Sequence, residues 1–463
     1  MSALATRIES RAERSLAAEE IFEITRAREK SLSRLLTLYI TTGLAFMLLP
    51  GTFLGVWNLL AISSHRAANS VSAGWIQAHG HAQIFGWIGT FILGIGFYSI
   101  PKLRRLNPFA LCAAWTCWAL WTAGITLRWL TGVYQWHWRI LLPISAGFEL
   151  AAFLIFFSSV SGHRPRESGK PSLENWVLVV ITASIGLLAA LLVNLGACAY
   201  LSARGASPDL PAGFDQRFLV LETWGFLVPF VWGFSAKWLP VFLGLRPIRQ
   251  RWLLGALGAN SFGVLIAMAG WITLAAIGLC GGMLISTWAL RLLEPTQNPA
   301  KTKGVHPSFP VFIRLAYVWA MLAAVLGIWA SLLFDSHGIW GASRHALTVG
   351  FLATMVFSIG QRVLPAFSGM RLLFSSKLMF VSLLLLAIGC FVRVSSEIVA
   401  YQGFASWAWS WLPVSAVTEM TAVTVFAVNL VLTFNSLPPS ATDTLDVKSQ
   451  EDSESSPQMV LPL

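Results

Sequence analysis

The sequence predicts an all-α integral membrane protein with about twelve membrane-spanning helices. Of its 463 residues, 56% are hydrophobic and only 11% are charged, which is far from the composition of a soluble domain. Most of its apolar runs exceed the roughly 18 residues that indicate a helix crossing a bilayer. Its basic residues gather in alternate loops between these runs, as they do in multi-pass membrane proteins. The lipid bilayer is therefore an expected partner, and a soluble α/β architecture is excluded.

The apolar runs place the helices in order, with boundaries good to a few residues. The expected helices lie at roughly 35–61, 74–100, 108–130, 137–160, 174–201, 217–243, 252–269, 271–293, 311–334, 342–367, 376–398 and 407–435. The seventh and eighth are the least clearly divided, at Ala269 and Gly270. Residues 1–34 are expected to form a cytoplasmic amphipathic segment, and the acidic, Ser- and Pro-rich tail 436–463 is expected to be disordered.

The distribution of charge predicts the topology. The net charge is +11, and basic residues follow the even-numbered helices, so the positive-inside rule puts both termini in the cytoplasm. The helices at 74–100, 217–243 and 342–367 then start at the outer face. The basic residues form no patch with interleaved aromatic residues, so a nucleic-acid partner is not expected.

These three helices are also related in sequence. When His81–Pro101 is set over His345–Pro365 without gaps, His, Ala, two Gly, Thr, Ile and the final Pro coincide. The helix at 217–243 keeps the first of these glycines and the proline, but it has Val220 in the histidine position. The pattern predicts three pseudo-repeated four-helix arcs. The expected blocks are about 35–160, 174–293 and 311–435.

The repetition extends to the helices that follow. "LPISAGFELAA" matches "LPVSAVTEMTA" and so pairs Glu149 with Glu419, and Arg128 matches Arg393 near the outer ends of two further helices. The carboxyl groups lie near mid-membrane, where a charge is costly. Both are candidates for proton relay, for holding an imidazole in one tautomer, or for a neutral structural role, and Glu222 is a further candidate of this kind.

His81 and His345 are expected at one depth, near the outer face, on helices that run in the same direction. Two neutral imidazoles in this arrangement could ligate a haem iron from opposite sides. Alternatively, each is a hydrogen-bonded packing residue or lines a pore. Three arginines near this level, Arg128, Arg393 and Arg344, could bind haem propionates or could instead extend to the membrane interface.

His79 cannot face the same iron as His81, because two residues on a helix are about 200° apart. It either binds a second metal, of which copper is the expected one, or hydrogen-bonds a neighbouring helix.

Two motifs, "HGHAQIFGW" and "RHALTVGFLATMVFSIGQRV", resemble the NnrS family of bacterial membrane proteins. More distantly, the chain is similar to the catalytic subunit of the haem-copper oxidase and nitric oxide reductase superfamily, in which the pair matching His81 and His345 ligates the low-spin haem. The resemblance implies a haem b protein of the bacterial inner membrane, with copper as a second metal, that works in the response to nitric oxide. Nitric oxide or a redox partner would be its further partner.

The chain also departs from the oxidase pattern. The superfamily builds its binuclear centre with a histidine in helix six and a histidine pair in helix seven, and this sequence has neither, so enzymatic activity is uncertain. The sequence leaves a second hypothesis open: a haem-free transporter or permease built from parallel four-helix repeats.

Overall fold

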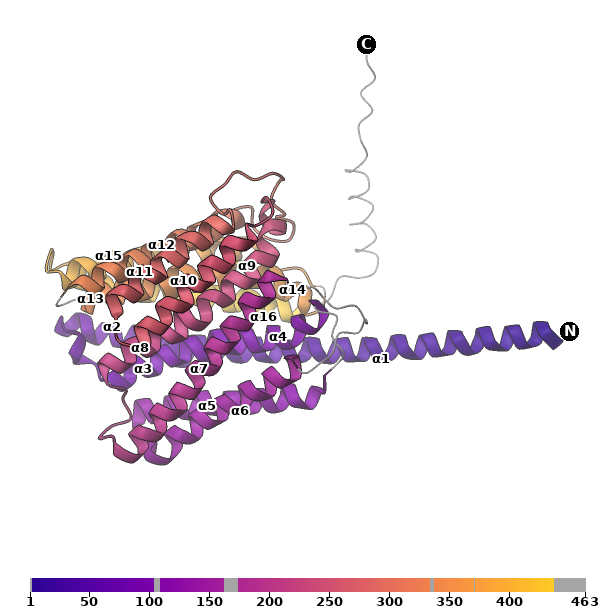
Figure 1. Ribbon diagram of the computed structural model, residues 1–463, viewed down its shortest axis with the longest axis horizontal. Helices are drawn as coiled ribbons and strands as arrows, with labels where there is room; N and C mark the ends of the chain where they lie inside the picture. The colour runs from indigo at the N-terminus through magenta and orange to yellow at the C-terminus, as the bar shows by residue number, and fades with distance from the viewer. Residues whose placement is uncertain (1, 104–108, 162–173, 334–336, 370, 437–463) are drawn as a thin grey trace, which may run out of the picture.

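The computed structural model describes residues 2–103, 109–161, 174–333, 337–369 and 371–436. These residues form helices and connecting loops, with no strand among them (Figure 1). In chain order the elements are α1 (Ser2–Phe46), η1 (Met47–Phe53), α2 (Leu54–His65), η2 (Ala68–Ser70), α3 (Ala73–His81), η3 (Ala82–Gly89), α4 (Thr90–Leu103), α5 (Leu111–Tyr134), α6 (Trp138–Ser161), α7 (Asn175–Arg204), α8 (Ala212–Val220), η4 (Leu221–Leu227), α9 (Val228–Leu243), α10 (Gln250–Met268), α11 (Ile272–Ala289), α12 (Phe309–Leu332), α13 (His337–His345), η5 (Ala346–Ala353), α14 (Thr354–Phe367), α15 (Ser376–Tyr401) and α16 (Ala408–Asn435).

The described residues contain eleven helical spans that are long and apolar enough to cross a membrane. α5 is a twelfth long helix of 24 residues, which carries Arg128 and four tryptophans and packs along α6 in the same bundle. The expectation of an all-α, multi-pass membrane protein is therefore confirmed.

Most helix boundaries lie within a few residues of their predicted positions. α15 begins at residue 376 and α16 ends at residue 435, both as expected. The break expected at Ala269 and Gly270 separates α10 from α11, and Gly270 has a φ of 95°, which residues with a Cβ rarely adopt. The N-terminal segment is helical, but α1 continues without a break into the first span and projects beyond the bundle (Figure 1). From residue 437 onward, the predicted tail lies outside the described residues.

Four π-helical segments interrupt the described spans. One, η1, contains Pro50, which has no backbone N–H to donate. The other three occupy equivalent positions: η3 begins directly after His81, η4 directly after Val220 and η5 directly after His345. Isolated π segments within α-helices often occur at functional sites.

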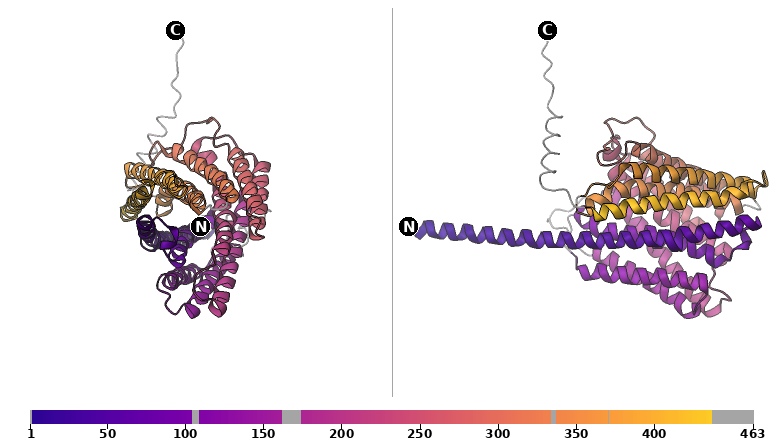
Figure 2. Two further views of the ribbon diagram at one scale, coloured as in Figure 1. Left: turned by 90° about the vertical axis from the view of Figure 1, so that its left-hand side faces the viewer. Right: turned by 180° about the vertical axis from the view of Figure 1, so that it is seen from behind.

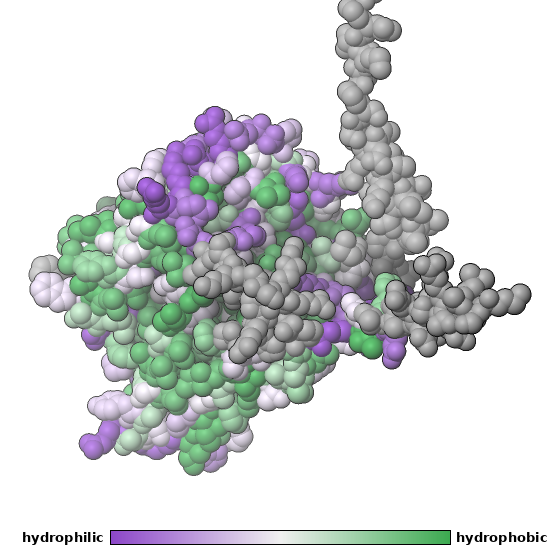
Figure 3. Space-filling view, turned by 45° about the vertical axis from the view of Figure 1, so that its right-hand side comes forward, coloured by the Kyte–Doolittle hydropathy of each residue, from purple (hydrophilic) through white to green (hydrophobic). Residues whose placement is uncertain are grey.

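Neighbouring spans pack as antiparallel pairs, most extensively α5 with α6, α10 with α11 and α15 with α16. α16 also packs along α2, so the last helix returns to the first (Figure 2). Many large apolar side chains point outward, among them Leu49, Leu265 and Phe391, and hydrophobic residues cover much of the face in Figure 3. Such a surface suits contact with lipid chains.

Candidate functional site

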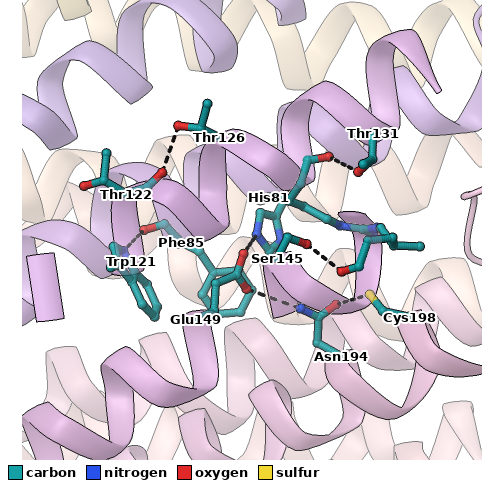
Figure 4. A network of polar contacts seen from close by, with 12 residues as sticks. His81, Phe85, Trp121, Thr122, Thr126, Thr131, Ser145, Glu149, Asn194 and Cys198 are labelled. Carbon is teal, nitrogen blue, oxygen red and sulfur yellow. Dashed lines mark hydrogen bonds and ion pairs between the residues drawn. The ribbon is translucent and has the colours of Figure 1, made fainter. Parts of the chain in front are cut away.

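Two buried polar clusters lie where the equivalent histidines were predicted. We call the first the α6 cluster; it consists of His81, Glu149, Asn194 and Cys198 (Figure 4). His81 Nε2 lies 2.8 Å from Glu149 Oε1, and Asn194 Nδ2 donates to Glu149 Oε2 at 3.3 Å. Cys198 Sγ donates to Asn194 Oδ1 at 3.5 Å. Glu149 therefore has a partner for each carboxylate oxygen. One of the alternatives predicted for Glu149 was to hold an imidazole, and it contacts the His81 ring in this way.

The local sequence positions this cluster. His81 is the last residue of α3, and the ring of Phe85, one turn later, lies against it with 4.8 Å between ring centroids. Glu149 reaches the cluster because α5 presents Gly124 to it: a Cβ at Gly124 would lie 2.8 Å from Glu149 Cγ and 2.9 Å from the backbone oxygen of Ser145. α5 and α6 can approach this closely only where the side chain is absent.

Arg128 belongs to the surroundings of the α6 cluster. It is 6% exposed and interacts electrostatically with Asp215, Glu222 and Cys198. Sequence reasoning missed Asp215, although it stands in the first turn of α8, beside Pro211, at the outer start of a predicted span. Its sequence signal was a single acid at the start of an apolar span, with no periodic pattern to mark it.

We call the second group the α15 cluster; it consists of His345, Arg393, Glu397 and Glu419. His345 Nδ1 donates to the backbone oxygen of Gly341 at 2.9 Å and lies 3.5 Å from Glu397 Oε2. The same oxygen lies 3.5 Å from Arg393 Nη2. Glu397 was also missed from the sequence, although it follows Arg393 by four residues and so shares its helix face.

The α15 cluster contains polar atoms without hydrogen-bond partners among the described residues. They are Nε and Nη1 of Arg393, Oε2 of Glu397 and Oε1 of Glu419. The Arg393 side chain is only 7% exposed. Glu419 lies against Gly389 as Glu149 lies against Gly124, with 2.6 Å from its Cγ to an added Cβ. Glu419 has no histidine partner in this arrangement, because His345 turns to Gly341 and Glu397 instead.

His79 hydrogen-bonds a neighbouring helix, which was one of its two predicted alternatives. Its Nδ1 lies 2.8 Å from the backbone oxygen of Gly51 in η1, and its ring packs on Gly55, where a Cβ would lie 2.7 Å from His79 Cε1. His79 interacts electrostatically with Arg393 and with His345. The residue without a counterpart in the repeat is therefore close to the α15 cluster.

Arg344 lies between the α15 cluster and α8. Its guanidinium donates to the side chain of Gln216 in α8, and it interacts electrostatically with Asp215 and Glu397. The structure thus brings together most of the predicted site residues, as two clusters rather than one. Glu222 lies near Arg128, Asp215 and Glu149.

The described residues fit a haem better than an isolated metal ion. No group of three or more His, Cys, Asp or Glu side chains among them could hold a metal ion. A haem brings four nitrogen ligands of its own and asks the protein only for axial ligands and for partners to its carboxylates. The unpartnered nitrogens of Arg393 beside His345 suit the carboxylates. Copper at His79 stays a prediction without a supporting ligand set.

In a comparison with known protein families, residues 220–434 match a family model described as a domain of unknown function (DUF8744). The match begins at Val220, includes the α15 cluster and excludes His79, His81 and Glu149. No curated protein matches the chain.

Proposed function

We propose that this chain is a haem b protein of the bacterial inner membrane, with both termini cytoplasmic. In this proposal His345 is one axial ligand and the other comes from the HGH motif of α3. The observation that carries it is a buried arginine with two unpartnered nitrogens beside a histidine whose Nε2 is free. A role in nitric oxide response or tolerance rests on the resemblance to the NnrS family.

The buried guanidinium favours an anionic ligand. An unpartnered buried donor costs about 1–3 kcal/mol, and more when it belongs to a charged group. Arg393 has two such nitrogens, and its one ion pair, at 3.5 Å, is long for a charge-assisted hydrogen bond. A haem propionate would supply acceptors for Nε and Nη1 of Arg393, which have no partner among the described residues. Arg344 and Arg128 are further candidates to hold the second carboxylate.

The tautomer of His345 favours metal ligation. Because Nδ1 donates to a backbone carbonyl, the lone pair of the neutral ring lies on Nε2. Histidines that ligate metals are commonly fixed in this way. The side chain remains 26% exposed, so the ring is not fully enclosed by the chain.

The fold proposal is that three four-helix arcs arose by repetition and resemble the haem-copper oxidase arrangement. Two features support it. The π segments begin at equivalent points in the second helix of each arc. The contacts of Gly124 with Glu149 and Ser145 recur as those of Gly389 with Glu419 and Ser415.

The chemistry of this site would be supplied by the haem, which when bound carries electrons or, with an axial position open, binds nitric oxide. The residues of the chain hold it: two imidazoles at the iron and arginines at the carboxylates. Position 220 holds valine, and the described residues offer no second metal set, so the proposal includes no binuclear reduction centre.

The decisive experiment is a reduced-minus-oxidised absorption spectrum of the purified full-length protein from haem-replete cells. The proposal expects the bands of a low-spin b-type haem at about one per chain, and their loss or conversion in His345→Ala. A replacement at His65, on the loop side of α2, serves as the matched control and leaves the bands unchanged. A colourless wild-type protein would sink the haem proposal and leave the transporter as the better hypothesis.

A further inference from the structure

α3 presents two histidines to opposite sides. His79 and His81 differ by about 200° around the helix, so only one of them can face His345. The repeat in the sequence selects His81, because His81 and His345 occupy equivalent positions. Three features of the side chains select His79 instead.

The first feature is which ring nitrogen is free. His79 Nδ1 donates to the backbone oxygen of Gly51, as His345 Nδ1 donates to that of Gly341. Both rings therefore keep Nε2 as the unprotonated nitrogen, the form that ligates a metal. His81 differs, because its Nε2 is held at 2.8 Å by Glu149, whose other oxygen is bound by Asn194.

The second feature is space. His81 is 8% exposed, and the ring of Phe85 lies against it. The His345 side chain is 26% exposed, and His79 is also partly accessible. The rings of His79 and His345 are thus less enclosed than the ring of His81, whose close packing would have to open to admit a large planar group.

The third feature is the neighbourhood. Arg393 interacts electrostatically with both His79 and His345, and these two rings interact with each other. The guanidinium with unpartnered nitrogens thus lies within reach of this pair. The two histidine nitrogens for the iron and the arginine for an acidic group of the ligand would then lie in one place.

We infer that His79 Nε2, rather than His81, is the second axial ligand opposite His345. This inference rests on the proposed haem function and deepens it. The partner of His81 is then Glu149, which fixes α3 against α6 and α7 without touching the haem. Gly51 and Gly55 become positioning residues, because one holds His79 Nδ1 and the other leaves room for the ring.

The experiment exchanges each histidine for a residue with a recognisable ligand signature. Full-length His79→Met and His81→Met proteins are purified, and the ferric haem is examined by absorption and electron paramagnetic resonance. His79→Met should give His/Met ligation, with new thioether-to-iron absorption and a raised reduction potential. His81→Met should keep the bis-histidine spectrum. The reverse result, or an unchanged spectrum in both variants, would overturn the assignment of His79.

A second variant covers the case in which a methionine replacement prevents folding. Gly55→Ala crowds the His79 ring, because the new Cβ would lie 2.7 Å from its Cε1, but it removes no candidate ligand. It should shift the low-spin resonance signals while haem content is retained. Gly147→Ala, where an added Cβ meets nothing within 4 Å, is the matched control. A Gly55→Ala spectrum identical to that of the control contradicts the inference, whereas a wild-type protein without haem contradicts the proposed function itself.

Discussion

The α6 and α15 clusters are built on the same sequence pattern but differ in how completely they are satisfied. In the α6 cluster, both oxygens of Glu149 have partners and the histidine is closely packed. In the α15 cluster, Arg393, Glu397 and Glu419 all carry buried atoms without partners. The glycine that admits the glutamate is present in both. The backbone framework is therefore shared, while hydrogen bonding is complete in only one of the two.

This difference suggests that the α6 cluster has a structural role and that the α15 cluster binds a ligand. Buried polar groups in folded proteins are nearly always paired, so a group of unpaired ones requires an explanation. The α6 cluster needs no ligand to be stable. The α15 cluster leaves a free imidazole nitrogen and an unpartnered guanidinium, which under the haem proposal would meet an iron and a carboxylate.

The largest expected effect separates the two glutamates. Glu149→Ala leaves both His81 and Asn194 without their buried acceptor and should destabilise the protein by about 3–5 kcal/mol. Glu419→Ala creates a similar cavity but removes fewer hydrogen bonds, so its cost should be about 2 kcal/mol smaller. Thermal unfolding in detergent, followed by tryptophan fluorescence, measures the difference. Equal losses would mean that the two clusters do not differ in the way described.

The two glycines test what the clusters share. Gly124→Ala and Gly389→Ala would each place a Cβ within 2.9 Å of a glutamate Cγ. Each should destabilise by about 1–3 kcal/mol, typical of an overpacked core. Gly147→Ala, on the same helix as Glu149 but in open space, should be neutral and serves as the control. If only one of the two glycines proved sensitive, the packing would not be equivalent.

Removing the ion pair of the α15 cluster should have opposite effects on stability and on cofactor binding. Replacing Arg393 with Met and Glu397 with Gln together removes the unpartnered nitrogens, and buried ion pairs exchanged in this way often leave stability equal or higher by about 1 kcal/mol. In haem-free protein the double variant should therefore unfold no earlier than the parent. It should also retain less haem after purification. A variant that keeps full haem content argues against Arg393 as the carboxylate partner.

The smallest expected effect lies outside both clusters. Glu174, just before α7, accepts hydrogen bonds from Lys237 Nζ at 3.0 Å and from Trp176 Nε1 at 2.6 Å. The bond from Lys237 holds the pKa of this carboxyl below its usual value. The stabilisation is therefore present above the unfolded pKa and is lost as the pH falls through the folded one. Because the pair is largely exposed, Glu174→Gln should cost only about 0.5 kcal/mol.

Melting curves at several pH values test that prediction. The difference between the parent and Glu174→Gln should be present near neutral pH and should fade in acid as the pH falls through the lowered pKa of the folded protein, where the parent carboxyl becomes protonated as well. A difference that persists in acid would assign the effect to packing.

The helices could be predicted from the sequence because the length of an apolar run is a local property. α15 and α16 illustrate this, because α15 begins at residue 376 and α16 ends at residue 435, both as predicted. The contacts of His81 could not be predicted in the same way, since they depend on how α3 is rotated against α6. The repeat in the sequence pairs Glu149 with Glu419, and each of them lies against a glycine, but the repeat gave no sign that His345 lies beside Glu397. Asp215 was missed because one acid at the start of a span has no periodic signal.

The π segments have a consequence for the phase of the helices that contain them. Each accommodates an extra residue in a turn, so the two halves of a span are offset relative to a regular α-helix. Deleting one residue from η3 would restore regular winding but would turn the half that carries His79 and His81 by about 100° relative to α4. The span would remain apolar and long enough to cross the bilayer, yet neither histidine would keep its present neighbour. A deletion in these helices is thus harmful because it rotates one half of the helix, even though the span stays long enough. A one-residue deletion in η3 or η5 is therefore a more severe change than its size suggests.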